Sequence, residues 1–439
     1  MTQSARAARR DNESSPPGSR PAARRGRLRA IGLGLITGAA DDDCSAIGTY
    51  ASAGAKFGTT LLWTAPLTFP MMFAVVYLSS KLGQVSGRGL FQAIRDYMPR
   101  WVLYTTLVGV MLGNTIEAGA DLGGMAAAIN LFLPIPIPLI VIPVAVAILA
   151  LQIWGSYTLI RNIFRWLSLS LLAYAVAAVL ARPEPGAVLR GTLIPTLQFN
   201  RESLSILVAI IGTTLSAYLY TWQSNEEVEE EIARGDTTVE ERAVATSGEL
   251  RRTRRDILWG MAFSNIVMYF IILATGSTLY PAGKRDIATA AEAAEALRPL
   301  AGDAAGVLFA IGIIAVGFLA VPVMTTGAAY DLAQSAGWRP TLNARFREAK
   351  RFYLLIIGVT AVAAGLNFLG INPMKGLVLA GIVQGFSTPP LLLLIMLLTN
   401  DRRVMGAQVN SRGMNVLGWV TTATIFAATV GLVATWVMG

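Results

Sequence analysis

The chain has 439 residues, of which 54% are hydrophobic and 14% charged, whereas a soluble domain carries about a quarter charged residues. Histidine is absent and cysteine occurs once, which excludes an intramolecular disulfide, Ser/His/Asp or Cys/His catalysis and histidine-containing zinc sites. No phosphate-binding glycine-rich loop is present, so we expect neither an enzyme nor a bound cofactor. The composition predicts an all-α polytopic membrane protein.

The first 28 residues are rich in Arg, Ser, Pro and Ala and show no hydrophobic periodicity. Such a segment buries too little apolar surface to fold, so residues 1–28 are predicted to be a disordered cytoplasmic tail. The transmembrane transporter domain is expected over residues 29–439, with about eleven transmembrane helices. The apolar spans lie at 31–54, 58–80, 101–131, 137–159, 163–181, 203–224, 256–279, 304–334, 352–370, 374–399 and 414–438.

The basic residues follow the pattern of a membrane topology. With the N-terminus placed in the cytoplasm, the inner segments hold 28 of the 36 Lys and Arg residues. This asymmetry agrees with the positive-inside rule and places the C-terminus outside. The net charge of +9 therefore reports topology, and we expect the lipid bilayer but no nucleic acid as a partner.

Span one contains three consecutive aspartates, Asp41, Asp42 and Asp43, in the segment IGLGLITGAADDDCSAIGTYASAG. A charged side chain at the bilayer centre costs about 2.5–3.5 kcal/mol on insertion scales, so three of them cannot face lipid. Gly38 and Gly48 flank the acidic run, which indicates an interrupted helix around a water-filled cation site. The alternative is an acidic loop or helix cap that only holds its own backbone.

Span six carries a similar interruption in GTTLSAYLYTWQ, residues 212–223. Spans one and six occupy matching places if helices 1–5 and 6–10 form an inverted repeat, with one extra helix at the end. Paired interrupted helices of this kind are typical of a secondary transporter with its site at the repeat interface.

Span three carries Glu117 and Asp121, which share one helix face because they are four residues apart. Two acids on one face inside a membrane indicate a proton relay or ion path, although such acids also pair structurally with Lys or Arg. The EEVEEE segment, residues 226–231, is expected to be a solvated helix end at the cytoplasmic side, with a metal-attracting vestibule as the alternative.

Three segments resemble the Nramp family of proton-coupled divalent-metal transporters, and in particular a divergent, Nramp-related bacterial branch. They are TGAADDDCSAIGTYASAGAKFG in span one, IEAGADLGGMAAAIN in span three and GTTLSAYLYTWQSNEEVEEE in span six. The resemblance covers roughly residues 30–400. It implies a LeuT-type fold with broken helices 1 and 6, alternating access, metal uptake by a monomer, and a bacterial inner membrane.

The resemblance also assigns metal positions. Asp43 falls on the aspartate of the family's Asp-Pro-Gly-Asn metal motif, while Ala46 stands in place of its metal-binding Asn. In span six, Ser216 stands in place of the metal-binding Met and Tyr218 in place of a His. Thr213 falls where the family offers a backbone carbonyl to the metal.

Further positions concern the tenth helix and the proton route. Ser387 stands where the family has a Gln near the metal. Asp121 falls on a proton-route Asp, but Gly124 replaces a Glu of that route. Lys350 and Arg351 match an Arg-Arg pair that opens the ninth helix.

The predicted ligand set contains only oxygen donors, which favour hard cations. The expected metal site comprises Asp43, Asp42, Asp41, Thr213, Ser216 and Ser387. The expected proton or ion path comprises Glu117, Asp121, Tyr218, Lys350 and Arg351. The ligand chemistry favours Mg²⁺, whereas the resemblance favours Mn²⁺ or Fe²⁺. Cys44 beside Asp43 would, as a soft ligand, reverse the preference for a hard ion.

We therefore predict a secondary transporter of divalent metal cations that works by alternating access, with the metal ion and, if transport is coupled, protons as partners. The missing His and Glu leave a passive or weakly coupled carrier open. A cation-coupled transporter of a small organic solute is an alternative, because an amine would also suit the aspartates. A non-coupled cation channel is another.

Overall fold

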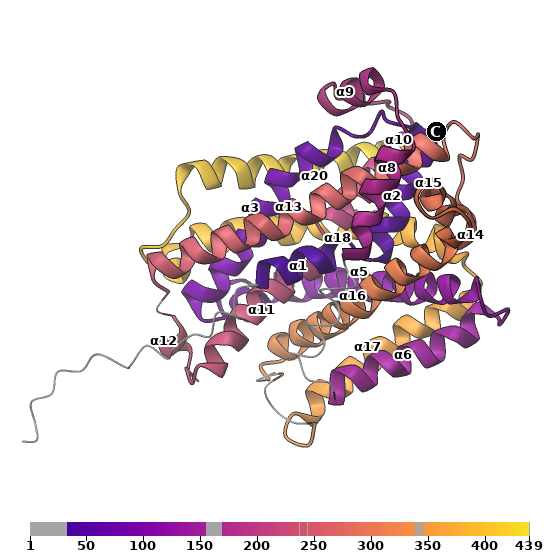
Figure 1. Ribbon diagram of the computed structural model, residues 1–439. Coiled ribbons are helices and arrows are strands. Elements are labelled where there is room, and N and C mark those ends of the chain that lie inside the picture. The colour runs from indigo at the N-terminus through magenta and orange to yellow at the C-terminus, as the bar shows by residue number, and fades with distance from the viewer. Residues whose placement is uncertain are drawn as a thin grey trace, which may run out of the picture.

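The computed structural model describes residues 33–154, 169–236, 238–243, 245–338, 342 and 346–438. All regular elements in this part of the chain are helices, and it contains no strand. The long helices lie side by side in one bundle (Figure 1). The all-α prediction is confirmed, while the predicted tail, residues 1–28, lies outside the described residues.

The helices follow the predicted spans closely. The first half of the chain forms α1 (Leu33–Asp41), α2 (Cys44–Phe57), α3 (Thr64–Ser86), α4 (Leu90–Tyr97), α5 (Arg100–Asn130), α6 (Ile137–Trp154), η1 (Leu169–Leu172), α8 (Ala173–Leu180) and α9 (Pro185–Leu193). The second half forms α10 (Arg201–Thr214), α11 (Ala217–Ala233), α12 (Val239–Arg242), α13 (Ser247–Thr278), α14 (Ala290–Ala294), η2 (Glu295–Leu297), α15 (Arg298–Ala301), η3 (Gly302–Ala304), α16 (Ala305–Ser335), α17 (Lys350–Leu366), η4 (Asn367–Leu369), α18 (Pro373–Asn400), α19 (Arg402–Met405) and α20 (Arg412–Met438).

Eight helical segments of the described chain are long and apolar enough to cross a membrane, and they correspond to predicted spans two, four and six to eleven. The helix of span three, α5, has 31 residues and reaches about 46 Å at 1.5 Å per residue, but it carries Glu117 and Asp121 and is less apolar. Span one is divided into two short helices. The start of span five, residues 163–168, lies outside the described residues, and η1 and α8 form the rest.

Both predicted interruptions are present. The chain leaves α1 at Asp41 and enters α2 at Cys44, and it leaves α10 at Thr214 and enters α11 at Ala217. Neither break falls on a glycine. Gly38 lies inside α1, where a Cβ atom would collide with the carbonyl of Gly260 on α13, so its role is close helix packing.

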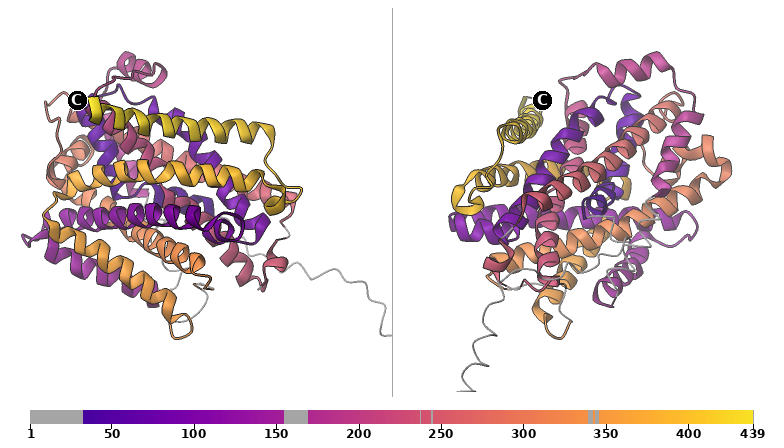
Figure 2. Two further views of the ribbon diagram at one scale, coloured as in Figure 1. Left: turned by 180° about the vertical axis from the view of Figure 1, so that it is seen from behind. Right: turned by 60° about the vertical axis from the view of Figure 1, so that its left-hand side comes forward.

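The interrupted helices lie inside the bundle and long helices surround them. α1 packs on α13, α2 packs on α13 and α18, α10 packs on α18, and α11 packs on α3 and α16. Figure 2 shows α20 along one edge of the bundle and the pair α6 and α17 along the opposite edge. These edge helices expose apolar side chains such as Val146 of α6 and Val430 of α20, as expected for helices that face lipid.

Candidate metal site between the broken helices

Five carboxyl groups lie at the centre of the bundle. Asp41, Asp42, Asp43, Glu117 and Asp121 are all fully buried. No Lys or Arg of the described chain forms an ion pair with any of them. Because an uncompensated buried carboxylate is costly, this arrangement requires cations or protons from outside the chain.

Asp43 is both the N-cap of α2 and a neighbour of the second broken helix. Its Oδ1 accepts hydrogen bonds from the Ala46 backbone N–H at 2.6 Å and from the Ser45 hydroxyl at 2.8 Å. Its Oδ2 lies 3.2 Å from the hydroxyl of Tyr218 on α11. The capping role therefore uses one carboxylate oxygen and directs the other across the gap between α2 and α11.

Glu117 on α5 lies at the same site as Asp43. Its Oε1 lies 3.1 Å from both the Ser45 and the Ser216 hydroxyl, and its Oε2 accepts from the Gln384 amide at 2.6 Å. Four elements thus meet at this one carboxyl group: the start of α2, the break before α11, α5 and α18. The structure brings Glu117, predicted on an ion path, together with the predicted metal ligands.

The other acids flank this centre on two sides. Asp121 Oδ1 accepts from the Ser45 backbone N–H at 3.0 Å, while its buried Oδ2 has no hydrogen-bond partner. The Ser264 hydroxyl of α13 lies within hydrogen-bonding reach of both Asp41 and Asp42. One hydroxyl hydrogen cannot serve two carboxylates, so the Asp41–Asp42 pair needs a proton or a cation.

Span six supplies hydroxyl and carbonyl oxygens. The Thr213 hydroxyl lies 3.0 Å from the Ser45 hydroxyl, and the Thr213 carbonyl accepts from the Ser216 hydroxyl at 3.0 Å. The Tyr218 hydroxyl donates to the Ala40 carbonyl at 2.7 Å, at the carboxyl end of α1. The carboxyl ends of α1 and α10 therefore face this region with partial negative charge, which favours a cation.

Three predicted site residues lie elsewhere or act indirectly. Lys350 and Arg351 are exposed at the start of α17, and the Arg351 guanidinium lies 5.5 Å from the Trp338 ring centroid rather than near the acids. Ser387 reaches the site only through its neighbour Gln384, to which its hydroxyl donates at 2.8 Å. The structure does not bring these three side chains into contact with the carboxyl groups.

Three polar residues of the site, Gln384, Asn114 and Ser45, were not predicted from the sequence. Gln384 precedes Ser387 by three residues, so it occupies the next turn of α18, and it bonds to Glu117 and to Asn114 Oδ1 at 3.1 Å. Ser45 was not among the predicted site residues, yet its hydroxyl links Asp43 with Glu117. One feature of the sequence could have indicated Gln384: it is an amide side chain inside the apolar span 374–399, and such side chains form hydrogen bonds between membrane helices.

The oxygens do not form a ready-made cage. In the described residues, no group of three or more His, Cys, Asp or Glu side chains converges on one metal position. The Ser45 hydroxyl lies between Asp43 and Glu117 instead. The Cys44 thiol donates to the Ile313 carbonyl on α16 at 3.4 Å, so its hydrogen is directed away from the Asp43 carboxylate.

The acidic end of α11 differs from the expectation of a solvated helix end. Glu226, Glu227, Glu229 and Glu231 are buried. Glu227 accepts from Ser80 and Gln84 of α3, each at 2.6 Å, because α11 packs closely against α3. The prediction of a solvated end was wrong, since these acids pack between helices.

The comparisons with known proteins agree with this geometry. Residues 34–435 match the family described as "Natural resistance-associated macrophage protein-like", Nramp. The chain belongs to the Nramp family. It is 28% identical over 404 residues to a divalent metal cation transporter MntH of Deinococcus radiodurans, which covers 91% of this chain and 88% of that protein. An MntH of Klebsiella pneumoniae is 26% identical and covers 92% of this chain and 93% of that protein.

Solved structures support the fold of this Nramp chain. A manganese transporter of Eremococcus coleocola superposes with a TM-score of 0.66 at 18% identity, covering 92% of this chain and 85% of that one. The inward-facing conformation of Mhp1 gives a TM-score of 0.51 at 13% identity, covering 93% and 91%. The predicted family, the multi-pass membrane architecture and the LeuT-type fold are confirmed.

Proposed function

We propose that this Nramp protein is a secondary transporter of divalent metal cations and not an enzyme. The observation that carries the proposal is the set of five fully buried carboxyl groups without a basic partner in the described chain. They gather where two interrupted helices direct the carbonyl oxygens of their ends, such as those of Ala40 and Thr213, toward side-chain hydroxyls instead of a continuing helix. Relatives of similar length are named divalent metal cation transporters, which supports the same substrate class.

The donor chemistry supports a hard ion. Asp43 and Glu117 would supply carboxylate oxygens, Ser45 and Ser216 hydroxyl oxygens, and Thr213 a carbonyl oxygen. Such oxygens suit Mg²⁺ and Mn²⁺ better than softer metals. The manganese transporter with a similar fold favours Mn²⁺. The oxygen donors favour Mg²⁺, because the Cys44 thiol is directed at the Ile313 carbonyl instead of Asp43. Fe²⁺ is the third substrate to be tested.

Alternating access requires contacts that close the site on each side. On one side, Thr37 of α1 donates to Gln223 of α11 at 2.6 Å, and Gln223 donates to Glu227 at 2.9 Å. On the other, Lys56 at the end of α2 pairs with Glu202 at 2.6 Å. The first contact joins α1 to α11, and the second joins α2 to α10. Breaking only one of the two contacts would therefore open the site on one side.

Proton coupling is the less supported part of the proposal. Asp121 has a buried oxygen without a partner, which suits a proton-binding position. Lys350 and Arg351, in contrast, are exposed and have no contact with the acids. The geometry supports a carrier whose protons, if any, use the Glu117 and Asp121 carboxyls.

The protein is proposed to act as a monomer in a bacterial plasma membrane, with its N-terminus in the cytoplasm. The distribution of Lys and Arg supports this orientation, because 28 of the 36 then lie on inner segments. The Lys56–Glu202 contact would accordingly face outward and the Thr37–Gln223 contact inward.

Uptake into proteoliposomes tests the proposal. Vesicles with an internal metal-sensitive dye are given Mn²⁺, Mg²⁺, Fe²⁺ or Ca²⁺, and a second dye records internal pH. Asp43→Asn is expected to reduce metal uptake at least tenfold, while Asp303→Asn, the same change at an exposed acid, leaves it unchanged. Equal uptake by wild type and Asp43→Asn would refute the metal-carrier function, and metal entry without acidification would refute proton symport.

A further inference from the structure

Two sulfur atoms lie together next to the acidic site. A Cβ atom built at Gly317 of α16 would collide with the Met125 sulfur of α5 and would lie 3.1 Å from the Cys44 sulfur at the start of α2. Both sulfurs are therefore within 3.1 Å of one point, and both side chains are fully buried. Neither residue belongs to the oxygen-donor site described above.

Two glycines make room for the Cys44 side chain. Gly317 turns its bare backbone toward the two sulfurs, and a Cβ atom at Gly124 of α5 would lie 3.3 Å from the Cys44 Cβ. Because α5 packs on both α16 and α2, these glycines allow the three helices to approach closely. The close approach brings the Cys44 thiol beside the Met125 thioether.

The lone pairs of both sulfurs are available to a ligand. The Cys44 thiol donates to the Ile313 carbonyl at 3.4 Å, one turn before Gly317, and a thiol is a weak donor. In the described chain, the hydrogen bonds to methionine sulfurs go to Met72 and Met268 and not to Met125. No strong interaction therefore occupies the sulfur pair.

A carboxyl oxygen without a partner lies beside the sulfurs. Asp121 is one helical turn before Met125 on α5, and its Oδ1 accepts from the backbone N–H of Ser45, the residue after Cys44. Its Oδ2 is buried and has no hydrogen-bond partner. No Lys or Arg of the described residues pairs with it. A cation at the sulfurs would offset this buried charge.

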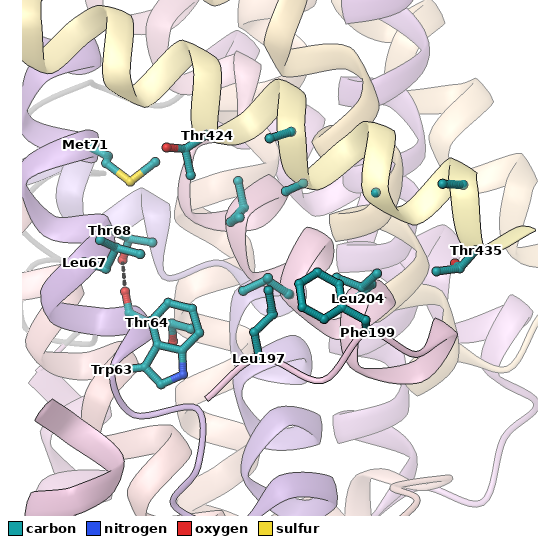
Figure 3. A pocket seen from close by; sticks show the side chains of 16 residues that line it. Trp63, Thr64, Leu67, Thr68, Met71, Leu197, Phe199, Leu204, Thr424 and Thr435 are labelled. Carbon is teal, nitrogen blue, oxygen red and sulfur yellow. Dashed lines mark hydrogen bonds between the residues drawn. The ribbon is translucent and has the colours of Figure 1, made fainter. Parts of the chain in front are cut away.

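Three other buried methionines lack such a setting. Met71 faces a cavity of about 520 Å³ between α3, α10 and α20, and it is the only sulfur-bearing side chain among the described residues that line it (Figure 3). The sulfurs of Met72 and Met268 both accept from the Asn265 amide, at 3.6 and 4.0 Å. The site at Gly317 differs from these because it combines a thiol, a thioether and an unpartnered carboxyl oxygen.

We propose that Cys44, Met125 and Asp121 form a second metal site, for a soft ion of low coordination number such as Cu⁺. Thiolate and thioether donors select such ions, whereas the oxygen donors near Asp43 suit hard ones. On binding, the thiol loses its proton to solvent, and the ion accepts electron pairs from the two sulfurs and from Asp121 Oδ2. No electron is transferred.

The geometry allows one ion to bind both sulfurs. With metal–sulfur bonds of about 2.3 Å, the two atoms stand at most about 4.6 Å apart, and the flexible Met125 side chain can reach this separation by small rotations. A hard and a soft ion would then bind at neighbouring positions of the α2 start. This inference concerns binding alone and does not require that the protein transports metal.

Titration with Ag⁺ tests the inference, because Ag⁺ has the soft chemistry of Cu⁺ and is stable in air. Calorimetric titration of the purified protein in a chloride-free buffer is expected to show one tight site per chain. Cys44→Ser retains a donor to the Ile313 carbonyl and should weaken Ag⁺ binding at least a hundredfold. Met125→Leu, a change of similar volume, should weaken it at least tenfold.

Met396→Leu is the matched control. The Met396 sulfur also packs on a glycine, Gly418, but its neighbour there is Leu78 instead of a second sulfur, so the variant should bind Ag⁺ like wild type. X-ray absorption of the bound Ag⁺ counts its sulfur neighbours, with two expected in wild type and one in Met125→Leu.

A single sulfur neighbour in wild type, or equal Ag⁺ affinity in wild type and Met125→Leu, would overturn the inference, because Cys44 would then bind Ag⁺ as an isolated thiol. Mn²⁺ binding, measured on the same preparations, should be unchanged in Met125→Leu. Neither Ag⁺ result bears on the metal-carrier proposal, which depends on Asp43.

Discussion

The hydroxyl of Ser216, at the break before α11, lies 3.1 Å from Glu117 Oε1 on α5. This contact joins a residue predicted to bind metal with a residue predicted to lie on an ion path. Because Ser45 links the same carboxyl to Asp43, the two predicted groups form one site. We therefore propose that Glu117 binds the substrate together with Asp43, in addition to its predicted place on an ion path.

Gln384 should contribute more to this site than Ser387. Its amide donates to the Glu117 carboxylate at 2.6 Å, and a hydrogen bond to a charged group contributes about 1.5–3 kcal/mol. Gln384→Ala is expected to raise the KM of metal uptake about tenfold, and Ser387→Ala less than twofold. Uptake kinetics in proteoliposomes measure both, and the reverse order of effects would contradict the assignment.

Cys44 is a natural reporter of access to the site. It is the only cysteine of the chain and is fully buried beside Asp43. Gln223→Leu removes the hydrogen bond from Thr37 of α1 to α11, so it should speed modification of Cys44 by a maleimide at least tenfold. Intact-protein mass spectrometry follows the reaction. Equal, fast labelling of wild type and variant would show that the site is not closed.

Much of the fold was predictable because each span is a long apolar run bounded by charged residues. The interruptions at Asp42 and Leu215 were also predictable, since three acids and adjacent Thr and Ser are poor choices for lipid. The role of Gln384 was not predictable. The resemblance pointed to Ser387, which is three residues, or about one helical turn, further along α18. Nor was the burial of Glu227, which depends on how α11 packs against α3.

The contact between the Lys56 amine and the Asp286 carboxylate, 2.7 Å long, should respond to pH. The hydrogen bond and charge of Lys56 lower the pKa of Asp286, so the contact is intact above the ordinary carboxyl range and is lost as pH falls below the lowered pKa. At pH 7, Asp286→Asn should raise hydrogen exchange in residues 280–290, and the difference from wild type should shrink as pH falls through the lowered pKa of Asp286.

High salt should weaken the same contact, since the Asp286 side chain is 77% exposed. A difference in exchange between wild type and Asp286→Asn that stays constant as pH falls through the acid range would contradict an ionic contact.

Gly212 should be a stability position in α10. A Cβ atom there would collide with the Gly381 carbonyl on α18, so Gly212→Ala forces the two helices apart. Overpacking of this kind costs about 1–3 kcal/mol. Thermal unfolding in detergent should show a lower midpoint for Gly212→Ala than for Gly358→Ala, where the added methyl meets open space. Equal midpoints would refute the tight packing.

The central claim is that Asp43 and Glu117 together hold a divalent cation between the broken helices. Electron paramagnetic resonance of Mn²⁺ titrated into the purified protein tests it most directly. Wild type and Asp303→Asn are expected to bind one Mn²⁺ per chain, and Asp43→Asn and Glu117→Gln to bind at least tenfold more weakly. Unchanged stoichiometry and affinity in both variants would contradict the account.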